Sequence, residues 1–91
     1  MSKKELLLKQ ALSALDDVEE AYETGLMSDA KTSVYQLLEE VKGSWRLGPI
    51  LKIRLIRVLR KAWRSISGFG STYSRAANAT YWLYQAVKIL Q

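Results

Sequence analysis

Apolar residues recur every three or four positions along most of the chain. In the first segment they are Leu8, Ala11, Leu15, Val18 and Tyr22. In the second they are Ala30, Val34, Leu37, Leu38 and Val41. This repeat places the apolar side chains on one side of an α-helix. No segment has the alternating pattern of a β-strand, so the sequence predicts an all-α protein.

Residues that start and end helices divide this pattern into segments. Ser2 and Glu5 have the spacing of a capping box, and Gly25 follows the first segment as a helix-terminating glycine. Ser28 is expected to cap the second helix. Gly43 ends that helix, and Pro49 opens the third, since proline is well tolerated at a first helical position.

The fourth helix follows Gly68 and is expected to be capped by Ser71 or Ser74. The resulting prediction is four helices, at about residues 3–24, 29–42, 49–67 and 72–90. Short connections between amphipathic helices are typical of a helical bundle. We therefore expect one all-α bundle in a single domain of residues 1–91.

The third segment is amphipathic in an unusual way, because all of its charged residues are cations. Its apolar residues are Leu51, Leu55, Ile56, Val58, Leu59, Ala62, Trp63 and Ile66. Five cations fall on the opposite side, within about 120° around the helix axis. These residues, called the cationic arc below, are Arg54, Arg57, Arg60, Lys61 and Arg64. Two pairs, Arg57–Lys61 and Arg60–Arg64, are four residues apart, a spacing at which like charges cost about 0.2–0.5 kcal/mol per pair.

Charge is also segregated along the whole chain. Residues 1–40 hold four lysines and nine acids, a net charge of −5. Residues 41–91 hold ten lysines and arginines and no acid, a net charge of +10. The overall charge of +5 therefore conceals two halves of opposite sign. An uncompensated cationic surface attracts anionic polymers, and the planar guanidinium of arginine suits phosphate oxygens.

Five acids crowd the second half of the first helix. They are Asp16, Asp17, Glu19, Glu20 and Glu23. Their mutual repulsion, and their position near the negative end of the helix dipole, are locally unfavourable. Three explanations remain open: the acids are simply solvated, they neutralise the cationic arc within the chain, or they meet the basic face of another subunit.

The last helix is apolar on two sides. One strip, expected to face the core, comprises Tyr73, Ala76, Ala77, Thr80, Leu83, Tyr84 and Val87. The second strip comprises Ala79, Trp82, Ala86 and Ile89. Burial on both sides and an oligomer contact through the second strip are both compatible with this pattern. The residues assigned to such an interface are Trp82, Ile89, Ala79, Ala86, Asp16, Glu20 and Glu23. Trp45 is expected to cover the core from the loop before the third helix.

The residue types argue against enzymatic activity. The chain has no cysteine and no histidine, which removes thiolate chemistry, the commonest metal ligands and the usual general base. No glycine-rich phosphate loop occurs, and the acids of the first helix lie on one surface. We expect no catalytic residue, no metal site and no cofactor.

The leading hypothesis is therefore a non-catalytic helical protein that binds nucleic acid without sequence specificity. The cationic arc would hold the phosphates, with Arg46 and Arg75 as outer contacts. We expect it to act as a homo-oligomer. Its size and charge are typical of small chromatin proteins, viral nucleoproteins or accessory subunits.

The alternative hypothesis is a protein–protein module, of the assembly or inhibitor/immunity type, that binds an acidic protein surface. It would use the opposite charges and the apolar strip of the last helix. Membrane association ranks third, because a surface helix must free an apolar face that the core needs. With neither a signal peptide nor a spanning segment evident in the sequence, the expected location is cytoplasmic.

Overall fold

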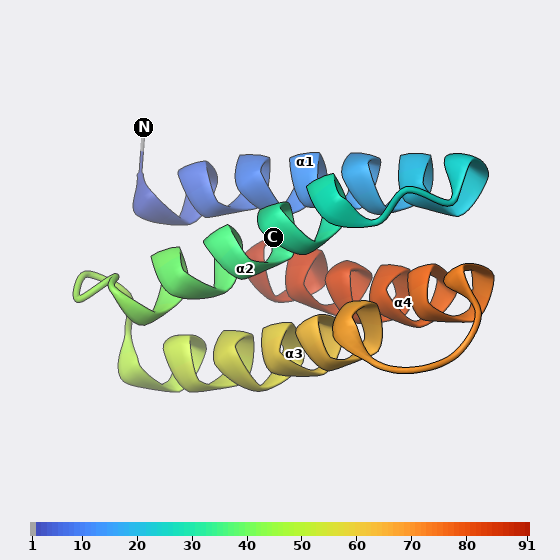
Figure 1. The fold of residues 1–91 in the computed structure, drawn as a ribbon. Helices are drawn as coiled ribbons and strands as arrows, with labels where there is room; N and C mark the ends of the chain where they lie inside the picture. The colour runs from blue at the N-terminus through green and yellow to red at the C-terminus, as the bar shows by residue number, and fades with distance from the viewer. Residues whose placement is uncertain (1) are drawn as a thin grey trace.

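Four helices joined by short connections make up the chain (Figure 1). The computed structural model describes residues 2–91. The helices are α1 (Lys3–Thr24), α2 (Ser28–Lys42), α3 (Pro49–Ser67) and α4 (Thr72–Leu90). Successive helices run in opposite directions, so the chain crosses the molecule four times in alternating directions. The predicted all-α bundle is confirmed, with helix bounds within one residue of those expected.

Serine side chains cap the first and last helices as predicted. The Ser2 hydroxyl accepts a hydrogen bond from the Glu5 backbone N–H at 3.1 Å. The Ser71 hydroxyl accepts one from the Ser74 N–H, also at 3.1 Å. Each bond satisfies a donor that the first turn of a helix leaves unpaired.

The prediction that Ser28 caps α2 is wrong. Met27 already has a helical backbone conformation, and its carbonyl accepts the Lys31 N–H at 2.9 Å. The helix therefore begins one residue early, with Ser28 as its first residue and no side-chain cap.

Gly25 ends α1 in the left-handed conformation, with φ of 78°. Its N–H bonds the Ala21 carbonyl at 2.8 Å, which closes the last turn. A Cβ at Gly25 would meet no other atom within 4 Å. The requirement for glycine at this position is therefore conformational and not steric.

Replacing Gly25 with alanine is expected to lower the free energy of unfolding by about 1–2 kcal/mol, because the left-handed region is unfavourable for L-residues. Gly48→Ala is the matched control, since Gly48 has φ of −59° and equally open surroundings. The free energy of unfolding of Gly48→Ala should change by less than about 0.5 kcal/mol. Alanine is a poorer helix cap than glycine, but it also makes the unfolded chain less flexible, and the two effects offset each other. Urea denaturation of the two variants measures the difference. Equal losses would contradict the conformational explanation.

Each helix packs against two neighbours, which gives the bundle a closed ring of contacts. α1 contacts α2 and α4, and α3 contacts the same two helices. Within residues 2–91 no backbone contact joins α1 to α3 or α2 to α4. Figure 1 shows α1 and α3 on opposite edges of the molecule. The outer faces of these two diagonal helices therefore point away from each other.

The core forms where the apolar faces of all four helices meet. The predicted buried face of α2 is confirmed in full. On α1 the buried residues are Leu7, Ala11, Ala14, Leu15, Val18 and Ala21. Tyr22, expected in this stripe, is exposed instead. The buried face is shifted because α1 packs between two helices, and small alanines allow both to approach closely.

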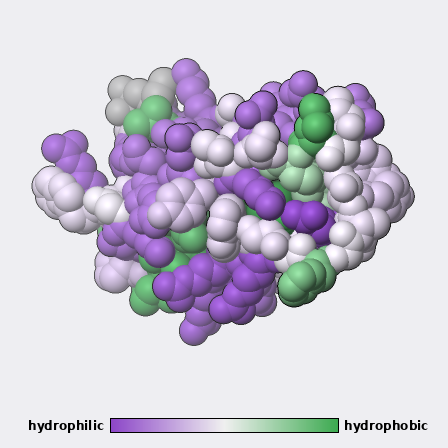
Figure 2. All heavy atoms as spheres, viewed as in Figure 1, coloured by the Kyte–Doolittle hydropathy of each residue, from purple (hydrophilic) through white to green (hydrophobic). Residues whose placement is uncertain are grey.

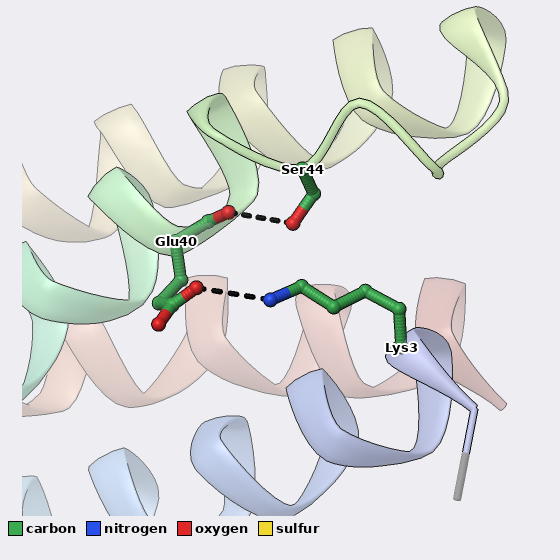
Figure 3. Close-up of polar contacts among 3 residues, drawn as sticks. All are labelled: Lys3, Glu40 and Ser44. Atoms are coloured by element: carbon green, nitrogen blue, oxygen red, sulfur yellow. Dashed lines mark hydrogen bonds and ion pairs between the residues drawn. The ribbon is translucent and has the colours of Figure 1, made fainter.

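One ion pair joins the start of α1 to the end of α2 (Figure 3). The Lys3 Nζ lies 3.0 Å from Glu40 Oε2. One turn later, the Ser44 hydroxyl donates to the Glu40 carbonyl at 2.7 Å, which satisfies an acceptor at the end of α2. Both side chains of the ion pair are partly exposed, so the pair adds little to stability, at most about 1 kcal/mol.

Candidate nucleic-acid interface

All five residues of the cationic arc have exposed side chains. They project from α3 on the side opposite its buried residues, Leu55, Leu59, Ala62 and Ile66. In Figure 2 hydrophilic side chains gather in the middle of the lower edge of the molecule, between hydrophobic ones, where Figure 1 places α3. The exposure that the amphipathic pattern predicted for these five side chains is confirmed.

In the part of the chain that the structure describes, no acid forms an ion pair with the cationic arc. The ion pairs among residues 2–91 are Lys3–Glu40 and Lys42–Glu39, and both lie on α1 and α2. The acids of α1 sit on the diagonal helix, with no backbone contact to α3 within the described residues. Of the three explanations for the acidic cluster, pairing with α3 inside one chain is therefore excluded.

In the folded protein, most of the cations and most of the exposed acids lie on different helices. α3 and α4 pack side by side and together carry eight lysines and arginines without an acid. Asp16, Glu19, Glu20 and Glu23 are exposed on α1, while Asp17 is half-buried and accepts a hydrogen bond from the Ser33 hydroxyl. Every charged residue of α3 and α4 is a cation, and α1 carries most of the exposed acids.

A shallow groove of about 500 Å³ runs between α3 and α4. Its cationic lining residues, from both helices, are Arg54, Arg57, Lys61 and Lys88. Tyr81 and Trp82 line it as well. The α3–α4 groove, as it is called below, thus combines positive charge with aromatic rings. Both are features of surfaces that bind nucleic acid.

The aromatic residues of the α3–α4 groove contact each other and one of the cations. The rings of Tyr81 and Trp82 are 4.8 Å apart between centroids, with one ring's edge toward the other's face. The Lys61 Nζ lies 4.5 Å from the centroid of the Trp82 ring, a cation–π contact. Trp82 is half-buried against the core, whereas Tyr81 is 56% exposed.

Sequence reasoning did not assign Lys88 to this surface. Lys88 is 27 positions from Lys61 in the sequence, and only the antiparallel packing of α3 against α4 brings both residues to one groove. The sequence did show that both segments lack acids, which favours a shared cationic face. It did not show that these two helices are neighbours.

Arg75 and Arg46, expected as outer phosphate contacts, lie away from the lining of the α3–α4 groove. Arg75 is half-buried, and its Nε and Nη2 donate to the Ile66 carbonyl at 3.2 and 2.6 Å. It therefore satisfies an acceptor at the end of α3. Arg46 is exposed in the loop before α3, with its guanidinium carbon 5.2 Å from the centroid of the Trp45 ring.

The expectation that Trp45 covers the core is wrong, because its side chain is 81% exposed. The core at this end is closed instead by Leu47, which is buried in the same loop. Trp45 projects into solvent beside Arg46.

The assignment of Ala79 and Ala86 to an exposed interface is also wrong. Both side chains are fully buried in the core. α4 packs between α1 and α3, so its buried face is centred between the two predicted strips. Trp82 and Ile89 are half-buried and pack against the same core. Tyr73 and Tyr84, predicted to face the core, are exposed.

The two tyrosines with shifted pKa values lie outside the α3–α4 groove. A hydrogen bond with Tyr73 raises the pKa of Tyr22, and the two rings are 4.6 Å apart between centroids. A hydrogen bond with Glu39 raises the pKa of Tyr35. Each ring contacts an aromatic ring of a neighbouring helix, Tyr22 that of Tyr73 on α4 and Tyr35 that of Trp63 on α3.

No family model, curated protein or solved structure matches this chain. None of the helices in residues 2–91 is both long and apolar enough to cross a bilayer. In the same residues, no three acids come together as a cation site.

Proposed function

We propose that the protein binds nucleic acid without catalysis, through phosphate contacts of the cationic arc. The observation that carries the proposal is that Arg54, Arg57, Arg60, Lys61 and Arg64 are all exposed and none has an acidic partner in residues 2–91. Repulsion between these cations is relieved when phosphates neutralise them. Release of the counterions condensed on the nucleic acid then favours binding.

Contacts to the phosphate backbone explain the arrangement better than reading of base sequence. A recognition helix presents polar side chains near its N-terminus to the base edges. α3 begins with Pro49, Ile50 and Leu51, which offer no such donors, and its cations extend along the shaft. Such a surface contacts the phosphate backbone of the nucleic acid and does not distinguish one base sequence from another.

A salt series on random-sequence DNA and RNA tests the proposal. If the five cations of the arc each neutralise one phosphate, log affinity for duplex DNA should fall against log salt with a slope of about −4.5. Fluorescence anisotropy between about 50 and 200 mM salt covers the range in which this dependence is steep. Absence of binding at the lowest salt concentration would contradict the proposal.

Contact between subunits is a second candidate, favoured by the exposed acids of α1. Because these acids and the cationic arc lie on diagonal helices, one subunit could place α1 against α3 of the next, and such a head-to-tail contact need not close. Light scattering at low and high salt tests this: association should weaken as salt screens the charges. A monomer at low salt and high protein concentration would exclude it.

A further inference from the structure

The α3–α4 groove places an exposed aromatic ring beside a row of cations. We infer that the groove binds single-stranded nucleic acid, with phosphates on its cations and one base stacked on Tyr81. This inference rests on the proposed function and specifies its substrate class and its site. It also extends the binding surface from α3 onto α4.

The cations of the groove are placed to follow a strand along its length. Arg54 and Lys61 are two helical turns apart on the same side of α3, about 10 Å along the axis. Because α3 and α4 are antiparallel, Lys88 lies toward the Arg54 end and Tyr81 toward the Lys61 end. A strand in the groove would therefore pass from cations of both helices to the aromatic pair.

Tyr81 is the ring available for stacking. Trp82 is held by the core and has the Lys61 ammonium 4.5 Å from its centroid. Tyr81 is 56% exposed, and its ring contacts the Trp82 ring at 4.8 Å between centroids. A ring that is already oriented loses little conformational entropy when a base stacks on it.

Single strands are favoured over duplexes for a chemical reason. In a duplex the faces of the bases are covered by their neighbours, so an aromatic side chain beside the phosphates has nothing to stack on. A single strand can turn an unstacked base toward the protein, and stacking on an aromatic side chain contributes independently of base identity. Positive charge alone would bind single strands and duplexes alike. The preference for a single strand therefore depends on the aromatic pair.

The experiment compares three probes at one ionic strength: an oligothymidylate, an abasic strand of equal length, and a duplex with the same number of phosphates. Tyr81→Ala removes the ring, and Tyr81→Phe keeps it. Tyr84→Ala is the matched control, because Tyr84 is 49% exposed on the same helix but does not line the groove. Circular dichroism and thermal unfolding establish that each variant is folded.

We expect Tyr81→Ala to weaken binding of the oligothymidylate about 5- to 160-fold, which corresponds to the free energy typically lost with one stacked base. Tyr81→Phe and Tyr84→Ala should bind as the unaltered protein does. The abasic strand should bind Tyr81→Ala and the unaltered protein equally, because it has phosphates but no base.

A second pair of variants tests whether the strand lies in the groove or on α3 alone. Lys88→Glu should make the salt slope for the oligothymidylate shallower by about 0.7, the value of one phosphate contact with a single strand. Lys9→Glu is the charge-matched control on α1, and should leave the slope unchanged. Equal slopes for these two variants would place the strand outside the groove and overturn the inference.

The outcomes separate this inference from the proposed function. If no probe binds the unaltered protein, both fall. If duplex and single strand bind equally and Tyr81→Ala binds normally, the proposed function stands and the single-strand inference is overturned. If Tyr81→Ala weakens binding of the abasic strand as much as that of the oligothymidylate, Tyr81 does not act by stacking, which also overturns the inference.

Discussion

Replacing Arg54, Arg57 and Lys61 together with glutamate should lower the affinity for nucleic acid about a thousandfold at 50 mM salt. Loss of three phosphate contacts changes the expected duplex slope from about −4.5 to about −1.8, and the difference grows as salt falls. The fold should persist, because all three side chains are exposed and glutamate is a good helix former.

Affinity measured by anisotropy across the salt series tests this result. The control is a triple variant in which glutamate replaces Lys4, Lys9 and Lys31. These three lysines lie on α1 and α2, outside the proposed surface. Both triple variants take the net charge from +5 to −1, so total charge is matched. If both triple variants lose affinity equally, binding follows net charge and not the α3–α4 face, and the proposed site is wrong.

Replacing Leu59 with alanine should lower the free energy of unfolding by about 2–5 kcal/mol. Leu59 is completely buried, and it is one of only four buried residues on α3. Its loss leaves a cavity that the neighbouring helices fill only in part. For a chain of this length the total stability is about 5–14 kcal/mol, so this single change removes a large share.

Thermal and urea denaturation measure the effect, and Leu12→Ala is the control. Leu12 is 47% exposed on α1, so its replacement should cost less than about 1 kcal/mol. Below its unfolding temperature Leu59→Ala should still bind nucleic acid, because the cationic arc is unchanged. Similar destabilisation by both leucine variants would contradict the position of the core.

The local structure could be predicted from the sequence because its causes are local. The bond from the Ser2 hydroxyl to the Glu5 N–H and the left-handed Gly25 depend on residues a few positions apart. The amphipathic period of α3 likewise requires only helical geometry to place its cations on one side. Ser28 was misassigned because the backbone at Met27 turns into the helix one residue earlier than the capping pattern indicates.

The candidate site could be predicted only in part. The five residues of the cationic arc share one helix, so periodicity alone placed them together on the exposed side. Lys88 and Tyr81 belong to the α3–α4 groove only because α4 packs antiparallel to α3. Arg75 looked equally available in the sequence, yet it is used to satisfy the carbonyl of Ile66.

The sequence by itself determined four helices, their ends to within one residue and a cationic side on the third, since each follows from short-range hydrogen bonding and a period of 3.6 residues. Only the tertiary structure decided which helices are neighbours. That choice buried Ala79 and Ala86, formed the α3–α4 groove and placed the acids of α1 diagonally from the cations of α3. Each helix packs against two neighbours, so which of its side chains are buried depends on where both neighbours lie. The neighbours are distant in the sequence, and the period of a single helix does not indicate their positions.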